Sequence, residues 1–491
     1  MGNREMEAHA TLAFRRYGAM SLVFPVVLGF LAFLWFGLAG QSGADQPGRA
    51  ETSTNGTPPG AQVAIPVAIV DAELVATSSA VLTSTPSLTL SGEAGYFYFG
   101  FRLTNIGDTD GDGYDDLVTA VEGYPPLRGR FHVFRGRPNG RNVNGDQTIV
   151  GPNPATVYFG ASIAAGDFDG DGVRDVVAGD SSFDDDRGRV LIYRGGSAGL
   201  GSVPMLTLTR SAGEWFGLTV IGLGDVNGDH FDDLAICAPG PWNSYGRVYV
   251  YFGTASGPAS SPAYTVTGSA GHSYKGRMVG DGDFNGDGFR DWVLPEDGSV
   301  EITVRYGGLG AMPPTSSITL NHSGTNWGTA LGPLGDINGD GFTDLAVADH
   351  SRSSVYIFLG GPGGLTTVPV MTLTGSTAQY EFGFDLSLGG DANGDGFADL
   401  AVGKRTFSGS DPGMVLVYLG GEEGLAPTPA LTLTGTEEEP IGASLAFVGN
   451  ALNANCDDLY VGVPGALSSA GRAYEFACVN RQSTFLPWVV R

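Results

Sequence analysis

Six short segments of the sequence place carboxylate and amide oxygens at a spacing that suits a bound cation. In GDINGDGFTDLAVAD, residues 335–349, these oxygens stand at positions 1, 3, 5 and 9 of a nine-residue loop, as Asp336, Asn338, Asp340 and Asp344. Carboxylates about 4 Å apart repel each other by roughly 4 kcal/mol at an effective dielectric constant of about 20. A cation among them would remove this cost, so the spacing predicts a metal site.

The other groups of this loop favour calcium. Phe342 at position 7 offers its backbone carbonyl, and Gly341 at position 6 permits a sharp turn. This number of hard oxygen ligands suits Ca²⁺, since Mg²⁺ prefers fewer protein ligands and keeps its waters. An EF-hand is excluded because it needs a bidentate Glu at position 12. In the six loops that position is held by Thr119, Ala178, Ile236, Leu294, Val347 and Val402.

We number the segments loops 1 to 6 in chain order and expect them to bind about six Ca²⁺ ions, since six matched copies disfavour simple acidic turns. They read GDTDGDGYDD, GDFDGDGVRD, GDVNGDHFDD, GDFNGDGFRD, GDINGDGFTD and GDANGDGFAD. The candidate ligands at positions 1, 3, 5, 7 and 9 are Asp108, Asp110, Asp112, Tyr114, Asp116, Asp167, Asp169, Asp171, Val173, Asp175, Asp225, Asn227, Asp229, Phe231, Asp233, Asp283, Asn285, Asp287, Phe289, Asp291, Asp336, Asn338, Asp340, Phe342, Asp344, Asp391, Asn393, Asp395, Phe397 and Asp399.

Two copies depart from the pattern. Loop 3 carries His230 instead of Gly at position 6, which costs roughly 1–2 kcal/mol if its φ is positive. We therefore expect loop 3 to be the weakest of the six sites. A seventh copy, GNALNANCDD, has Leu452 and Ala454 at positions 3 and 5, and we expect it to bind no metal.

The loops belong to a long repeat. Counting the seventh copy, their first positions follow at intervals of 59, 58, 58, 53, 55 and 59 residues. Each unit holds four short runs rich in Val, Leu, Tyr and Phe, separated by Gly and Pro, which is typical of strands. Seven small sheets cannot each bury both faces alone, so we expect them to stack radially. The predicted fold is all-β, a seven-bladed β-propeller of four-stranded antiparallel blades.

The ring is expected to close through an N-terminal strand. The last unit lacks an outer strand, while TPSLTLSG, residues 85–92, precedes the first acidic loop. We expect this segment to complete the seventh blade and so to remove the exposed sheet edges.

Two of the three cysteines stand where the seventh unit differs from the others. Cys456 occupies position 7 of the seventh loop, and Cys478 stands where most units carry a Gly at the end of the third strand. Antiparallel pairing brings the start of the second strand beside the end of the third. We predict a Cys456–Cys478 disulfide that replaces calcium there, with two separate buried thiols as the alternative. Cys237 is expected in the core.

These features resemble the FG-GAP repeats of the integrin α-chain headpiece and its bacterial relatives. Units begin with an aromatic-Gly pair (YFG, WFG, EFG), continue into the D-x-[DN]-x-D-G-x-x-D loop and form a circle of seven. The resemblance implies calcium in the hairpin between the first and second strands of each blade. Lys275, Trp327 and Ile441 depart from the Phe-Gly pair. The even spacing excludes an inserted metal-binding adhesion domain.

The N-terminus predicts export. Residues 17–40, YGAMSLVFPVVLGFLAFLWFGLAG, are uncharged and follow two arginines, as in an export signal or a single membrane anchor. The predicted organisation is an n-region at 1–16, this signal or anchor at 17–40, a linker at 41–80, the propeller at 81–480 and a tail at 481–491. We expect a protein that is secreted or held at the extracellular face of the membrane, where disulfides persist.

Composition narrows the function. The net charge of −26 disfavours nucleic acid as a partner. We expect a monomeric, non-catalytic calcium-binding module for ligand binding, cell-surface recognition or adhesion, with a carbohydrate or protein ligand and no membrane contact beyond the anchor. Trp242 and Tyr245, in the turn GPWNSYG, are the candidate ligand contacts. The alternatives are a propeller lyase or glycosidase acting on polysaccharide, for which no catalytic residues are found, and a scaffold within a larger envelope assembly.

Overall fold

The computed structural model describes residues 80–93, 97–122, 128–152, 158–240, 246–268, 279–295, 301–310, 317–321, 327–375, 381–405, 412–449, 456–464 and 470–480. The chain divides into two units, Met1–Pro66 and Val67–Arg491, and every described residue belongs to the second. The predicted n-region, the export signal or anchor, nearly all of the linker and the tail lie outside the described residues. Among the described residues, no helix is long and apolar enough to cross a membrane.

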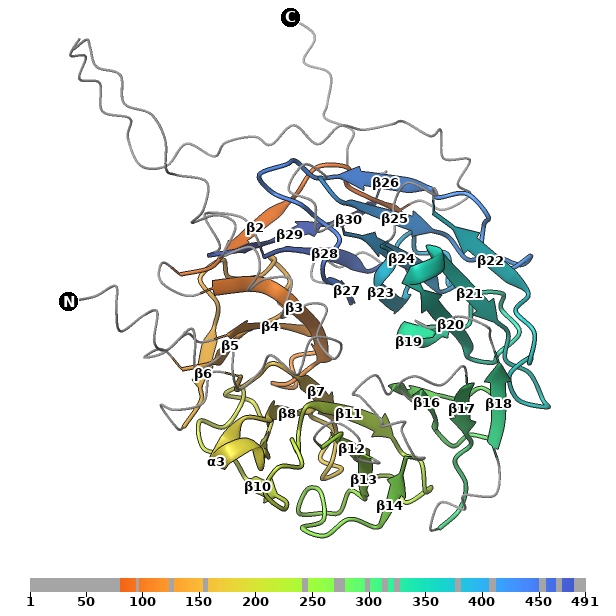
Figure 1. The fold of residues 1–491 in the computed structure, drawn as a ribbon. Helices are drawn as coiled ribbons and strands as arrows, with labels where there is room; N and C mark the ends of the chain where they lie inside the picture. Colours follow the sequence, from red (N-terminus) through yellow and green to blue (C-terminus); the bar gives the residue numbers. More distant parts are fainter. Residues whose placement is uncertain are drawn as a thin grey trace, which may run out of the picture. The chain divides into compact units, whose positions relative to one another are not determined.

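Seven antiparallel sheets of four strands follow one another along the chain, as predicted (Figure 1). In blades 1 to 3 the strands are β3 (Phe97–Gly107), β4 (Asp116–Glu122), β5 (Arg130–Phe134), β6 (Gln147–Val150); β7 (Ile163–Gly166), β8 (Asp175–Asp180), β9 (Arg189–Tyr193), β10 (Leu206–Thr209); and β11 (Thr219–Gly224), β12 (Asp233–Ala238), β13 (Arg247–Tyr251), β14 (Tyr264–Thr267).

Blades 4 to 6 repeat this order. Their strands are β15 (Val279–Gly282), β16 (Asp291–Pro295), β17 (Glu301–Arg305), β18 (Ser317–Asn321); β19 (Trp327–Gly335), β20 (Asp344–Asp349), β21 (Ser354–Phe358), β22 (Met371–Thr374); and β23 (Phe382–Gly390), β24 (Asp399–Lys404), β25 (Met414–Tyr418), β26 (Leu431–Thr434). The described helical segments are two short turns, α3 (Phe183–Asp186) and η1 (His350–Arg352).

The ring closes in blade 7, which combines β27 (Leu445–Val448), β28 (Asp458–Val463) and β29 (Arg472–Phe476) with β2 (Leu88–Ser91). β2 pairs antiparallel with β29, with Leu88 opposite Glu475. The innermost strands touch in the order β3, β7, β11, β15, β19, β23, β27, and β27 touches β3 again. The predicted closure by residues 85–92 is thereby confirmed.

The second strand of each blade is buried on both faces, because the blade is packed between two neighbours. In β8, Val177 belongs to a core shared with Leu234 and Tyr251 of blade 3. The adjacent Val176 belongs instead to a core shared with Phe131 of blade 1. Both faces are therefore apolar, and the run DVVAGD is continuously buried without the alternation of a sheet that faces water on one side.

A short extra sheet, absent from the sequence prediction, joins the two ends of the propeller. β1 (Ala80–Leu82) pairs antiparallel with β30 (Cys478–Asn480). Cys478 and Cys456, which were predicted to be paired, form a disulfide with their Cα atoms 6.0 Å apart. Cys478 thus lies in this extra strand, beyond the end of the third strand of blade 7. Cys237 is buried in the core, as expected.

The junction between blades 7 and 1 contains buried polar groups where the junction between blades 1 and 2 is apolar. Val118, Val133 and Leu200 lie together in the core between blades 1 and 2. The equivalent positions between blades 7 and 1 are Tyr460, Glu475 and Arg141.

These groups are joined by specific contacts. The Arg141 Nε donates a hydrogen bond of 2.8 Å to the Tyr460 Oη, and its guanidinium lies 5.4 Å from the Tyr460 ring centre. Burial, and then the neighbouring Asp458, raise the pKa of the Glu475 carboxyl to about 7. Arg141 is contributed by blade 1, so the last interface of the ring is chemically distinct from the first.

This distinction predicts opposite effects for a single and a triple substitution. Arg141→Leu removes the cation that faces a buried acid pair, and we expect it to lower the free energy of unfolding by about 3 kcal/mol. Combining Arg141→Leu with Tyr460→Val and Glu475→Val installs the apolar set of the blade 1–2 junction. That triple variant should recover most of the loss. Urea unfolding of the three proteins measures this, and a neutral Arg141→Leu variant would contradict it.

Candidate metal centres

Each of the six acidic loops connects the first strand of a blade to the second, as the family resemblance implied. Two backbone positions per loop are left-handed. Position 4 is a Gly with φ between 71° and 80° in every loop. Position 6 is Gly with φ between 86° and 89° in five loops, but His230 in loop 3, with φ of 71°. The strain expected of His230 is therefore present, and loop 3 stays the site predicted to be weakest.

The carboxylate at position 1 organises the backbone of each loop. In loop 5 the Asp336 Oδ1 accepts hydrogen bonds from the backbone N–H groups of Gly339 at 2.6 Å and Asp340 at 3.1 Å. Its Oδ2 accepts from the N–H of Gly341 at 2.8 Å. The bonds from positions 5 and 6 recur in all six loops. The loop is thereby wrapped around its first carboxylate.

Positions 1, 3 and 5 converge. In loops 1 and 2, the groups Asp108–Asp110–Asp112 and Asp167–Asp169–Asp171 each offer oxygens that lie within 4.8 Å of one another.

In loops 3 to 6 position 3 is Asn, and its amide donates to the position-5 carboxylate. The Nδ2–Oδ2 distances are 3.0, 2.9, 3.0 and 2.9 Å, from Asn227 to Asp229, Asn285 to Asp287, Asn338 to Asp340 and Asn393 to Asp395. In these four loops the position-3 amide thus lies against the position-5 carboxylate.

Position 9 has a second role that the sequence prediction missed. The Asp344 Oδ2 accepts from the N–H of Ile337 at 3.0 Å, and its Oδ1 accepts from the N–H of Gly360 at 2.8 Å. These bonds tie the start of the loop and the start of the second strand to the end of the third strand. In blade 7, Asp458 keeps the same contact, accepting from the N–H of Cys478 at 2.8 Å. The seventh loop keeps Asp at position 9 although its positions 3 and 5 are no longer acidic. This retention is the sequence signal that could have revealed the second role of position 9.

Burial of the position-9 carboxyls is complete or nearly so, and it raises their pKa. Asp344 is fully buried, and desolvation raises its pKa to about 7. The pKa is raised to about 6 in Asp116, to about 7 in Asp175 and Asp291, and to about 8 in Asp233 and Asp399. In each case nearby carboxylates of the same loop add to the effect of burial. A cation at the loop would favour the charged form of all of them.

The loops are also linked from blade to blade. The backbone carbonyl at position 1 accepts from the N–H at position 8 of the next loop, for example Asp283 O from Thr343 N at 3.0 Å. In the next pair, the Phe397 ring at position 7 lies directly against the position-4 Gly339 of loop 5. The loops therefore form a continuous belt rather than six separate hairpins.

The residues present fit calcium. Ligands of one Ca²⁺ ion lie 2.3–2.6 Å from it, so two ligand oxygens stand at most about 5 Å apart. The 4.8 Å clusters of loops 1 and 2 meet this limit. Within loop 1, the Asp110 Oδ1 is buried and has no hydrogen-bond partner, which is the condition of an oxygen available to a metal. The donors are all hard oxygens.

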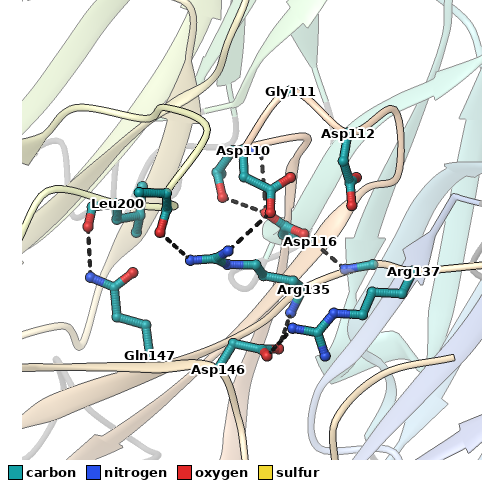
Figure 2. Close-up of polar contacts among 12 residues, drawn as sticks. Asp110, Gly111, Asp112, Asp116, Arg135, Arg137, Asp146, Gln147 and Leu200 are labelled. Atoms are coloured by element: carbon teal, nitrogen blue, oxygen red, sulfur yellow. Dashed lines mark hydrogen bonds and ion pairs between the residues drawn. The ribbon is translucent and has the colours of Figure 1, made fainter.

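Loops 1 and 2 are each contacted by an arginine from outside the loop, which the sequence prediction did not consider. The Arg135 Nη1 lies 3.2 Å from the Asp110 Oδ2, and Figure 2 shows the guanidinium reaching this carboxylate from below the loop. Arg194 pairs with Asp169 of loop 2 in the same way. Neither arginine stands inside an acidic segment, so the motif gave no sign of them.

The predicted ligand contacts Trp242 and Tyr245 lie outside the described residues. By contrast, the aromatic side chains directly before Gly are placed. Phe99, Phe159, Phe216, Trp327 and Phe382 are all buried between blades. They serve packing and are not available as a binding surface.

Comparison with known proteins agrees with this geometry. Residues 108–178 and 336–402 match a model described as FG-GAP-like repeat, and residues 217–251 match one described as FG-GAP repeat. Integrin alpha-V of Gallus gallus is 30% identical over 222 residues, covering 40% of this chain and 21% of the relative. Integrin alpha-PS2 of Drosophila melanogaster is 30% identical over 265 residues, covering 50% of this chain and 15% of the relative.

The similarity to integrins is confined to a part of those proteins. Integrin alpha pat-2 of Caenorhabditis elegans is 26% identical over 310 residues, covering 61% of this chain and 21% of the relative. The match thus spans about a fifth or less of the length of these relatives. The chain carries FG-GAP repeats in a seven-bladed β-propeller, and over 40–61% of its length it is similar to integrin alpha chains.

Proposed function

We propose that this protein is a calcium-binding, non-catalytic extracellular β-propeller that acts in ligand binding, cell-surface recognition or adhesion. The observation that carries the proposal is the set of six corresponding loops, each wrapped around its position-1 carboxylate and each with a buried carboxylate at position 9, with carboxylate oxygens within 4.8 Å of one another in loops 1 and 2. The relatives point the same way, because they are integrin alpha chains.

Calcium would stabilise the ring through the loop belt. The six loops carry 20 carboxylates at positions 1, 3, 5 and 9. Without a cation these groups repel one another, and six of them are also buried with raised pKa values. Six Ca²⁺ ions, each held by its own loop, would relieve both costs. The disulfide and the calcium requirement both favour an extracellular location.

The alternative is a propeller enzyme, a lyase or glycosidase that acts on polysaccharide. Catalytic acids and bases stand in a cleft with shifted pKa values. His132 has its pKa lowered to about 4, but by burial between strands, and Phe99 and Phe134 lie beside its ring. Glu475 belongs to the closure junction. Outside the loops, both of these shifted groups serve the interior of the protein.

The first expected outcome concerns metal content and stability. Native mass spectrometry of the whole protein should show about six Ca²⁺ ions, and chelation should lower Tm by well over 10 °C, since ligand binding stabilises only the folded state. Asp395→Asn in loop 6 should remove or weaken one ion. Asp185→Asn, outside the loops, is the matched control and should remove none. A protein without bound calcium and without a shift on chelation would refute the calcium site.

The raised pKa values predict the pH dependence of the calcium-free protein. The folded protein binds protons at position 9 more tightly than the unfolded chain does, so this contribution to stability is present at low pH and is lost as pH rises through about 6 to 8. In chelator, Tm should therefore fall between about pH 5 and about pH 8. With calcium the fall should shrink, because the cation stabilises the carboxylates. Equal slopes in both conditions would contradict this account.

The binding role has its own test. Glycan and protein arrays probed with the calcium-loaded protein should give a ligand of one of these two kinds. Trp242→Ala and Tyr245→Ala should each weaken that binding about tenfold or more, as aromatic contact residues do. Tyr356→Ala, a partly buried aromatic of β21, is the comparison for nonspecific damage. Binding that persists undiminished in both variants would exclude these two residues from the contact.

A further inference from the structure

We propose that Arg135 and Arg194 are built-in counter-cations that keep loops 1 and 2 formed when calcium is absent and weaken their calcium binding, so that the chain holds two kinds of metal site. The inference rests on the proposed calcium binding and concerns its regulation. The supporting observation is that two positions of the repeat change together from one blade to another.

The first of these positions is position 3 of the loop. It is Asp in loops 1 and 2, as Asp110 and Asp169, and Asn in loops 3 to 6. The second position is the residue directly before the Gly that donates to position 9. It is Arg in blades 1 and 2, as Arg135 and Arg194. In blades 3 to 6 it is held by Phe252, Tyr306, Leu359 and Leu419. An additional carboxylate is therefore accompanied by an arginine each time.

The two positions meet in the structure (Figure 2). The Arg135 Nη1 stands 3.2 Å from the Asp110 Oδ2, with 19% and 10% of the two side chains exposed. The Arg194 Nη2 and Nε both contact the Asp169 Oδ2, whose side chain is fully buried. Arg194 also stands 4.0 Å from the Asp171 carboxylate. Because each pair is at least partly withdrawn from water, its attraction is stronger than that of an exposed ion pair.

In loops 3 to 6 an uncharged group, in place of an arginine, donates to the loop carboxylates. There the Asn at position 3 donates its amide to the carboxylate at position 5, as Asn338 does to Asp340 at 3.0 Å. In blade 1 the position before the Gly also contacts the next blade, because the Arg135 Nη2 donates to the Ala198 carbonyl of blade 2. In blades 3 to 6 an uncharged side chain stands at this position. Tyr306, for example, accepts from the N–H of Leu365 of the next blade at 3.1 Å. Arginine thus takes the place of the Asn amide as the donor to the loop carboxylates.

The arrangement has opposite consequences with and without calcium. Without it, each arginine offsets the repulsion of a fourth carboxylate, so loops 1 and 2 hold their shape. When calcium binds, it must share the position-3 carboxylate with the guanidinium. In loop 1 the Asp110 Oδ2 is already bonded to Arg135, and the Oδ1 alone remains without a partner. The like charges also repel. In the described part of the chain, no arginine or lysine pairs with the carboxylates of loops 3 to 6, and loop 3 has only the His230 imidazole 3.9 Å from the Asp225 carboxylate. These four loops therefore depend on calcium more strongly.

Loop 1 can be observed separately from the others. It is the loop with a tyrosine at position 7, Tyr114, where the other five carry Val or Phe. A terbium ion in this loop should luminesce when excited through tyrosine, and Tyr114→Phe should remove that signal. Terbium titration of the full-length protein, with calcium competition, then reports the affinity of loop 1 alone.

The test compares Arg135→Leu, Asp110→Asn and the double variant, which gives loop 1 the residues of loops 5 and 6. Arg135→Leu should lower Tm in chelator by about 2–4 °C and raise the terbium affinity of loop 1 about tenfold. The double variant should restore the Tm in chelator. As the reciprocal control, Leu419→Arg with Asn393→Asp should make loop 6 resemble loop 1, with a smaller loss of Tm on chelation.

The outcomes separate the two proposals. If wild-type protein binds neither calcium nor terbium, the proposed calcium binding fails and this inference fails with it. If wild-type binds both ions, but Arg135→Leu leaves the terbium affinity unchanged or lowers it, the calcium proposal stands and the counter-cation inference is overturned. An unchanged Tm in chelator for Arg135→Leu would also overturn it.

Discussion

The aspartate at position 9 is the interaction on which the rest of each blade depends. Its carboxylate is buried, and in blade 5 it accepts hydrogen bonds from the start of the acidic loop and from the Gly beyond the third strand. One side chain thereby fixes three strands at the same end of the blade. Such a group is costly to bury unless it is fully hydrogen-bonded. Its presence in all seven blades, including the one whose loop has lost its other acidic ligands, shows that it serves the fold before it serves a metal.

Around this fixed point the loops take up two further duties. Their backbones pass hydrogen bonds from one blade to the next, so that the face of the ring that carries the loops is tied circumferentially. Their side chains concentrate negative charge in the same place. The carboxylates of the loops therefore repel one another at the same place where the blades are hydrogen-bonded to each other. The proposed calcium ions would replace this repulsion by attraction.

Much of the fold followed from local pattern. The period of the acidic loops, the apolar runs after them and the missing outer strand of the last unit were sufficient to predict seven blades and closure by residues 85–92, because these signals emerge when the units are compared, although the closing strands β2 and β29 are far apart in the sequence. The pairing of Cys456 and Cys478 was accessible in the same way, since both stand where the seventh unit departs from the others. Calcium ligation at positions 1, 3 and 5 remains a prediction, although the structure brings those side chains together.

What escaped prediction depends on distant or cross-blade contacts. Arg141 and Tyr460 meet across 319 residues, and no periodicity marks them. Arg135 and Arg194 lie 25 residues beyond the aspartates they contact, outside the motif that drew attention to the loops. The β1–β30 sheet is three residues per strand, too short for any propensity to register. The sequence did not reveal the second role of position 9, because the same Asp suits both a metal ligand and a buried hydrogen-bond acceptor.

The small β1–β30 sheet also decides how the propeller would respond to mechanical tension. Ala80 stands opposite Asn480, so the chain enters and leaves the ring at the same end of this sheet. Opposing forces on these two residues would break the hydrogen bonds of the sheet one after another, as in unzipping, and would not load them all at once, as in shear. On the C-terminal side the pull would then reach Cys478 and pass through the disulfide into the beginning of β28. On the N-terminal side it would reach β2, which pairs with β29 along one edge and packs Leu90 into the core between blades 7 and 1, but carries no disulfide. The N-terminal strand is therefore the element that would yield first, and the disulfide makes the other end of the ring the fixed one.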